Sequence, residues 1–355
     1  MALAVQDRLA GAAADLESQD DGKVYSALAI LAMAGDGGKS HFGKILDIAK
    51  TSSNFAVKRA ALEAMALTCQ GQEAQATPVM EENLTSNDPG VRRAAAQGLG
   101  QVKSEGSIAK LSPLLMDSQM LVRNAAMAAL GAVGAKAGSE AGAVAANLRA
   151  PLLRVDAIRA IGKMGKEGAA HASEIAVFLE DSDPNVRLAV GEALHDMGDH
   201  VPDSVAEKAG ELLAHQQDRF RATAALALGS CGMARAGKHV VTLKQMLREN
   251  VPTFSPLLSP NCAAAVALGR LGTEGELLIG FLKSKNGRMR AAVCQAVAEM
   301  GKAGLSHASA IAKCLEEDED DGVRGAAFAA LEKLQKAGSL DSPAAAAMDA
   351  YRSGQ

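Results

Sequence analysis

The sequence is poor in aromatic residues: its 355 residues include no Trp, two Tyr and seven Phe. Apolar residues still make up 48% of the chain, and many of them are Ala. Small side chains let helices approach one another closely, but they cannot fill one deep core. Few aromatic rings also leave little for base stacking on single-stranded nucleic acid. The composition favours a thin, repeated helical core and argues against nucleic-acid binding.

Other absences narrow the class of protein further. Five cysteines are scattered along the chain with no C-x-x-C pair, which predicts reduced thiols in an intracellular, cytoplasmic compartment. The first residues lack a basic segment followed by a long apolar run, so we expect no secretory signal. No stretch of about 18 uninterrupted apolar residues predicts a membrane span. The net charge is −4 with both signs interspersed, and no basic stripe suggests a nucleic-acid partner.

What the chain does contain is a repeat. The stretch "DSDPNVRLAVGEALHDMG" at 181–198 has relatives such as "SNDPGVRRAAAQGLGQV" from Ser86 and "DEDDGVRGAAFAALEKL" from Asp318. An apolar or Pro residue opens each copy, and the spacing is 29 to 34 residues apart from one interval of 40. These opening positions are 24, 57, 91, 122, 153, 186, 220, 260, 289 and 323. A fixed period of this size predicts a solenoid of about ten units.

Each unit has the pattern of two helices. Val186, Val190 and Leu194 recur at helical spacing and form one apolar stripe. Asp183-Pro184 is a helix start, and Gly198 is a helix end. A second apolar pattern at 171–181 precedes this helix. The prediction is an all-α fold, a right-handed α-solenoid superhelix of about ten antiparallel helix pairs.

The motif D-x-D-P-x-V-R-x-A-A-x-x-A-L-G-x-x-G resembles the HEAT repeat, especially its short-period branch related to phycobilisome lyases. The resemblance covers roughly residues 20–337 and implies that an acid before the second helix and the Arg that opens it bond along the stack. Two repeats depart from the motif, because Asn261 replaces the Arg of the eighth repeat and Ser86 replaces the acid of the third. The implied stacking pairs are Asp117 with Arg123, Asp181 with Arg187, and Asp318 with Arg324.

We expect the repeat array to occupy 1–337 and a C-terminal cap or tail to follow at 338–355. The array contains a Pro-rich insertion at 249–260, where three prolines prevent a continuous helix. Phe254 and Leu257 are apolar residues of this loop, and they either fold back on neighbouring repeats or grip a partner.

No catalytic or metal site is predicted. His195-Asp196 invites comparison with the deoxyhypusine hydroxylases, HEAT-type enzymes in which His-Glu pairs recur and bind iron. Here no His-Glu dipeptide occurs, and most other repeats have Gly where His195 stands. His171 and His307 open the first helices of two repeats that are not neighbours, which indicates repetition of an ancestral unit. We therefore predict a chain that is not an enzyme and carries no cofactor.

The second helices are expected to line the concave side of the solenoid, and outward-facing positions there can bind a partner. An apolar strip with a basic rim suits an extended or helical protein segment that carries acidic residues. The residues expected in this groove are Arg59, Arg93, Arg159, Lys163, Leu188, Leu226 and Val266. The predicted function is a protein-interaction scaffold or adaptor. Alternatives are a structural subunit of a cytoskeletal or photosynthetic assembly, or a lyase- or hydroxylase-like enzyme.

Overall fold

The computed structural model describes residues 2–249 and 259–353, including their side chains except those of 2–6 and 36. All regular elements in this part of the chain are helices. The chain divides into two compact units, Met1–His171 and Ala172–Gln355. Phe254, Leu257 and most of the expected insertion at 249–260 lie outside the described residues.

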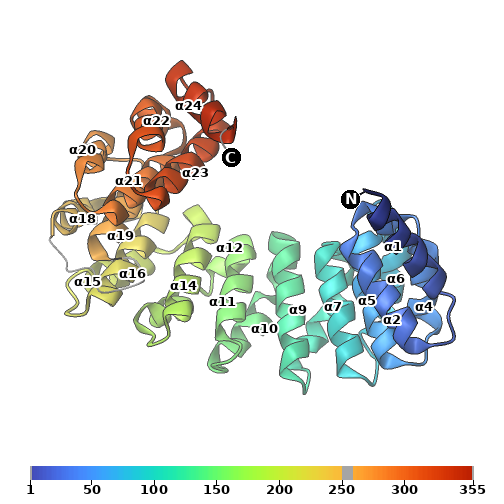
Figure 1. Cartoon of the computed structure of the whole chain (residues 1–355). Coiled ribbons are helices and arrows are strands. Elements are labelled where there is room, and N and C mark those ends of the chain that lie inside the picture. The colour runs from blue at the N-terminus through green and yellow to red at the C-terminus, as the bar shows by residue number, and fades with distance from the viewer. Residues whose placement is uncertain (1, 250–258, 354–355) are drawn as a thin grey trace. The chain divides into compact units, whose positions relative to one another are not determined.

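In the first unit, a layer of second helices runs from repeat to repeat, and neighbours in this layer pack side by side (Figure 1). The second helices are α2 (Asp21–Met33), α5 (Phe55–Thr68), α7 (Pro89–Gln101), α9 (Met120–Val133) and α11 (Arg154–Lys163). The first-helix layer holds α1 (Ala2–Asp15), α3 (Asp36–Lys39), α4 (Phe42–Thr51), α6 (Glu73–Asn83), α8 (Ile108–Leu111), α10 (Ala141–Ala145) and α12 (Gly165–Ala169). Short 3-10 turns extend several of these first helices: η1 (Glu105–Ser107), η2 (Ser112–Met116), η3 (Gly134–Glu140) and η4 (Ala146–Arg149).

The second unit repeats this arrangement. Its second helices are α14 (Pro184–Met197), α16 (Asp218–Ser230), α19 (Pro260–Arg270), α21 (Gly287–Glu299) and α23 (Asp321–Ala337). Its first-helix layer holds α13 (Ala172–Ala176), α15 (Asp203–Leu212), α17 (Met233–Ala236), α18 (Val240–Leu247), α20 (Gly275–Gly280) and α22 (Ala308–Glu317). The 3-10 turns in this layer are η5 (Val177–Glu180), η6 (Gly198–His200), η7 (Gly237–His239), η8 (Phe281–Lys283) and η9 (Gly301–His307). A last helix, α24 (Ser342–Ser353), packs on α22. The predicted all-α solenoid of helix pairs is confirmed.

Local sequence explains where these helices begin and end. Asp183 has extended backbone angles and its side chain accepts a hydrogen bond from the Asn185 N–H, while Pro184 occupies the first turn. Gly198 ends the same helix with a φ of 54°, a conformation that costs a residue with a Cβ much more than it costs glycine. The same left-handed conformation recurs at the ends of other repeats, at Gly134, Gly165, Gly232, Gly272 and Gly301.

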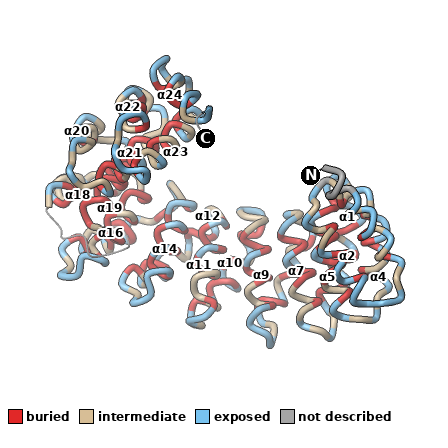
Figure 2. The backbone as a smooth tube through the Cα atoms, in the orientation of Figure 1, coloured by how far each residue is buried: buried red, intermediate tan, exposed pale blue. Residues whose placement is uncertain are grey.

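Buried residues run along the second helices in both units (Figure 2). Neighbouring second helices approach one another closely because glycine of one helix faces alanine of the next. A Cβ on Gly100 would lie 2.6 Å from the Cα of Ala129, and one on Gly229 would lie 2.8 Å from the Cα of Ala267. The alanine-rich composition therefore has a direct structural counterpart, since small residues allow neighbouring helices to approach this closely.

Candidate protein-binding grooves

The first unit has a cavity of about 550 Å³ on the face formed by α5, α7 and α9. We call it the N-terminal groove. Alanine and glycine form much of its lining, and Leu67 adds an apolar side chain that is 46% exposed. The lining consists of Glu63, Ala66, Leu67, Ala94, Gln97, Gly98, Gly100, Gln101, Ala128, Ala129 and Ala132.

One expected groove residue lies at the edge of this cavity. The guanidinium of Arg93 is 3.9 Å from the Glu63 carboxylate, and its Nε is buried without a hydrogen-bond partner. Glu63 is the one charged residue of the lining, so Arg93 offsets its charge. The N-terminal groove is therefore close to neutral and mainly apolar.

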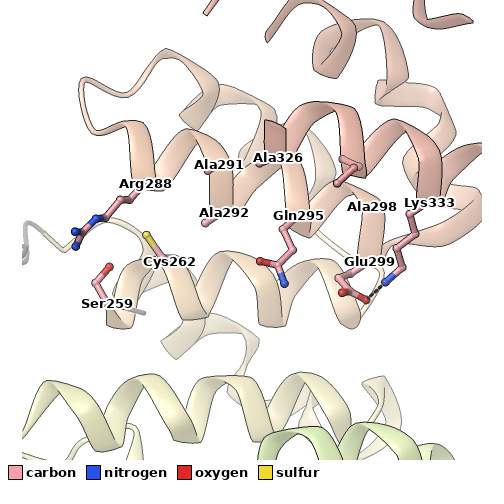
Figure 3. Close-up of a pocket in the computed structure, with 12 residues that line it drawn as sticks. Ser259, Cys262, Arg288, Ala291, Ala292, Gln295, Ala298, Glu299, Ala326 and Lys333 are labelled. Carbon is pink, nitrogen blue, oxygen red and sulfur yellow. Dashed lines mark hydrogen bonds and ion pairs between the residues drawn. The ribbon is translucent and has the colours of Figure 1, made fainter. Parts of the chain in front are cut away.

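The second unit has a cavity of about 510 Å³ on the corresponding face of α19, α21 and α23 (Figure 3). We call it the C-terminal groove. Half of its lining residues are alanines, and polar groups stand at its two ends. The lining consists of Ser259, Cys262, Arg288, Ala291, Ala292, Gln295, Ala298, Glu299, Ala326, Ala329, Ala330 and Lys333.

Charge is distributed unevenly along the C-terminal groove. At one end the Lys333 ammonium donates to the Glu299 carboxylate over 2.7 Å. At the other end Arg288 extends toward Ser259 and Cys262 (Figure 3). Gln295 is exposed between them and offers an amide over a floor of methyl groups. The groove can thus contact an apolar segment along its length and polar groups at its ends.

The seven residues expected in a groove are placed differently. Arg159 and Lys163 are exposed on α11, Arg59 is half-buried on α5, and Leu188 on α14 is 47% exposed. Leu226 on α16 is half-buried. None of the seven belongs to the lining of either groove.

The expectation for Val266 is wrong, because its side chain is only 1% exposed. Its helix, α19, packs between α16 and α21 and is buried from Pro260 to Gly269. The contacts of Gly229 with Ala267 and of Gly269 with Ala296 draw the three helices together. The outward position in the repeat pattern is therefore covered by neighbouring helices at this point.

In the described part of the chain, two arginine–aspartate bridges with paired hydrogen bonds link consecutive repeats. Arg92 of the third repeat donates to both carboxylate oxygens of Asp117 in the fourth, at 2.8 and 2.9 Å. Arg290 of the ninth repeat binds Asp318 of the tenth in the same way, at 2.7 Å to each oxygen. Each arginine also donates to a carbonyl of its own repeat, at Ser86 or Ser284. These bridges tie neighbouring layers through charge-assisted, two-pronged hydrogen bonds.

The stacking pairs implied by the repeat motif are in contact, but through the main chain. Arg123 donates to the Asp117 carbonyl at 2.5 Å, and Arg324 donates to the Asp318 carbonyl at 2.7 Å. Arg187 donates to the carbonyl of Asp181, also at 2.7 Å. In the fourth and tenth repeats the carboxylate of the same acid is bound by the arginine of the preceding repeat. One aspartate thus serves two repeats.

Sequence reasoning missed Arg92 and Arg290 as bridge residues, although a signal for them exists. The paired acid stands six residues before the opening arginine of the following repeat, as Asp117 stands before Arg123. After Arg187 this position holds His215, and the Arg187 guanidinium lies 5.6 Å from the centre of the Phe220 ring instead. Burial lowers the pKa of Arg187, with the charge of Arg219 as a lesser cause.

The bridges should make stability depend on pH. The hydrogen bonds from Arg92 and Arg290 lower the pKa of Asp117 and of Asp318. A carboxylate with a lowered folded-state pKa contributes stability above its unfolded pKa of about 3.9, and this contribution is lost as the pH falls through the lower folded value. We expect Asp318→Asn to lower the free energy of unfolding, measured with urea, at about pH 7. The difference from wild type should shrink as the pH falls below about 3.9. An unchanged difference across this range would contradict the ionic contribution.

The family follows from the repeats themselves. The family model for HEAT repeats matches residues 42–131, 77–150 and 141–229, which together cover 42–229 and more than half of the chain. The chain belongs to the HEAT-repeat family. A search of curated proteins found no significant match. The short-period, lyase-like subtype stays a prediction.

Solved structures share the fold of this chain. Yeast importin-β matches with a TM-score of 0.62 at 12% sequence identity, covering 98% of this chain and 52% of the importin. A second importin-β structure matches with a TM-score of 0.57 at 14% identity, over 93% and 51% of the two chains. An engineered protein matches with a TM-score of 0.50 at 19% identity, over 92% and 99%. The HEAT-repeat chain thus spans about half the length of the importins.

Two histidines of this HEAT-repeat protein pack against a glycine of the preceding repeat. His239 lies over Gly210, and His307 over Gly275, where a Cβ on either glycine would overlap the imidazole. Each imidazole thus occupies the space that a side chain would take at the glycine, in the first helix of the preceding repeat. His195 is exposed at the end of α14, and its pKa is lowered by partial burial and by the charge of Arg270. Within 2–249 and 259–353, no three His, Cys, Asp or Glu side chains are grouped to hold a metal.

No helix in the described part of the chain is long and apolar enough to cross a bilayer.

Proposed function

We propose that this HEAT-repeat protein is a non-catalytic scaffold that binds a protein segment on the face formed by its second helices. The observation that carries this proposal is the pair of grooves, one in each unit, on equivalent faces. Each is large enough for several side chains and is floored mainly by alanine or glycine.

The chemistry of the grooves favours an apolar segment of helical or extended form. A floor of methyl groups allows the partner's backbone to approach closely, and apolar contacts there exclude water. In the C-terminal groove Gln295 can pair with a polar group of the partner, and Lys333 and Glu299 can receive a polar end. Arg159 and Lys163 are exposed in the first unit and support a preference for acidic residues beside the apolar segment.

The likeness to importins supports this proposal at the level of architecture. One matched structure contains Kap95p in a complex with Nup1, at a TM-score of 0.55 and 13% identity. A HEAT-repeat array can therefore serve as a binding surface for another protein, and we extend that role, without the partner, to this chain.

The test is capture of partners from cell extract by wild type and by groove variants. We expect Ala128→Glu in the N-terminal groove or Ala329→Glu in the C-terminal groove to reduce capture at least about tenfold, because each buries a carboxylate under an apolar partner. Both alanines are exposed, so the fold should tolerate the change. Mass spectrometry measures how much of each partner a variant captures relative to wild type.

Matched controls place the same charge on the opposite layer. Ala143→Glu on α10 and Ala303→Glu on η9 change exposed alanines of the first-helix layer. Equal loss in these controls, or equal capture by all variants, would move the binding surface away from the grooves. Capture only as part of one large sedimenting complex would favour a structural subunit.

A further inference from the structure

Two cysteines lie one helical turn away from the bridge that joins the ninth and tenth repeats. Cys294 follows Arg290 by one turn of α21, and Cys314 precedes Asp318 by one turn at the end of α22. Arg290 donates to both carboxylate oxygens of Asp318 at 2.7 Å. This bridge brings the turn of α21 that follows Arg290 close to the turn of α22 that precedes Asp318. Cys294 and Cys314 are close enough for each thiol to shift the pKa of the other.

The two thiols differ in access to solvent. Cys294 is buried, whereas Cys314 is partly exposed on the surface of α22. Cys69, Cys231 and Cys262 are all buried. A reagent in solution can therefore reach Cys314 first.

The two thiols also differ in reactivity. The interaction with Cys294 is the main cause that lowers the pKa of Cys314, and the Arg290 charge acts in the same direction, while partial burial and the Asp318 charge oppose them. Burial raises the pKa of Cys69 and Cys262, and raises that of Cys231 to about 12. Since the thiolate is the form that is oxidised and the oxidant must reach it, we expect Cys314, which alone of the five cysteines is not buried, to react first.

We propose that Cys294 and Cys314 form an oxidisable dithiol, which a peroxide converts into a disulfide between the ninth and tenth repeats. The Cys314 thiolate attacks one oxygen of hydrogen peroxide, the O–O bond breaks, and Cys314 becomes a sulfenic acid while hydroxide takes up a proton and leaves as water. The sulfur of Cys294 then attacks the Cys314 sulfur. The S–S bond forms, the S–O bond breaks, and the Cys294 proton leaves with the hydroxyl as a second water.

The chemistry is that of two thiols and one peroxide giving one disulfide and two waters, and a small-molecule dithiol returns the pair to the reduced form. Cys294 supplies the resolving thiol, so overoxidation of Cys314 is prevented. The disulfide would fix α22 against α21, which forms much of the wall of the C-terminal groove.

The test uses the full-length reduced protein and hydrogen peroxide. After peroxide treatment the protein is unfolded in denaturant and its free thiols are counted with maleimide. We expect three free thiols in place of five, and one cross-link in peptide mapping between the peptides of Cys294 and Cys314. Dithiothreitol should restore all five. Retention of five thiols, a cross-link between other cysteines, or sulfinic acid at Cys314 without a disulfide would overturn the proposal.

Single variants separate the role of Cys314, which attacks the peroxide, from that of Cys294, which resolves the sulfenic acid. Cys294→Ala should leave a sulfenic acid at Cys314 that reacts with dimedone, and Cys314→Ser should slow thiol loss more than about tenfold. Alanine is a natural occupant of the first site, since Ala96 stands one turn after Arg92 beside the other bridge. If circular dichroism shows that Cys294→Ala is unfolded, Cys294→Ser carries the same test. Dimedone labelling of Cys69 or Cys262 at the rate of Cys314 would also contradict the assignment.

Discussion

Arg290→Ala is expected to lower the free energy of unfolding by about 2–4 kcal/mol, because it leaves a shielded carboxylate without its partner. The side chains of Arg290 and Asp318 are only 9% and 7% exposed. The variant removes two charge-assisted hydrogen bonds to Asp318 and one to the Ser284 carbonyl. Urea denaturation followed by circular dichroism measures the loss.

A surface pair supplies the matched control. Lys208 and Glu180 also join neighbouring repeats, at 2.6 Å, but their side chains are 39% and 37% exposed. We expect Lys208→Ala to cost no more than about 1 kcal/mol, since solvent screens exposed ion pairs. If Arg290→Ala costs as little as Lys208→Ala, the bridge contributes no more than a surface contact and its proposed role in stacking is wrong.

The helices and their ends could be read from the sequence because their causes are local. Asp183-Pro184 and Gly198 act within one or two turns of the chain, and their structural effects match the expectation. The repeat period then gives the pairing of helices, since each amphipathic helix must cover its neighbour's apolar stripe. The HEAT-repeat architecture is thus predictable from local signals repeated at a fixed distance.

The candidate site could be predicted only in part. The N-terminal groove is lined by Glu63, Gln97 and Ala128 of α5, α7 and α9, and not by the residues that were named from the sequence. Val266 failed because its exposure depends on how closely α16 and α21 approach α19, which no single repeat encodes. The Arg290–Asp318 bridge was missed because its partners lie in different repeats, 28 residues apart. Contacts between repeats depend on two motifs at once.

Close approach between helices can be tested at Gly269. A Cβ at this position would lie 2.6 Å from the Cα of Ala296 and would overlap the Ala296 carbonyl group. These atoms belong to the backbone of α21, so no side chain can rotate away to make room. We expect Gly269→Ala to destabilise the protein by about 2–3 kcal/mol, because α19 and α21 must separate. Thermal unfolding compared with wild type measures the effect.

Gly325→Ala is the control that separates packing from helix propensity. Gly325 also lies inside a second helix, α23, but a Cβ there would meet nothing within 4 Å. Alanine favours a helix interior over glycine by about 0.5–1 kcal/mol, so this variant should be as stable as wild type or slightly more stable. The opposite signs of the two substitutions follow from one difference, the distance to the next repeat. A stabilising Gly269→Ala would show that α19 and α21 can separate freely, and would contradict the glycine–alanine contact as a constraint on helix packing.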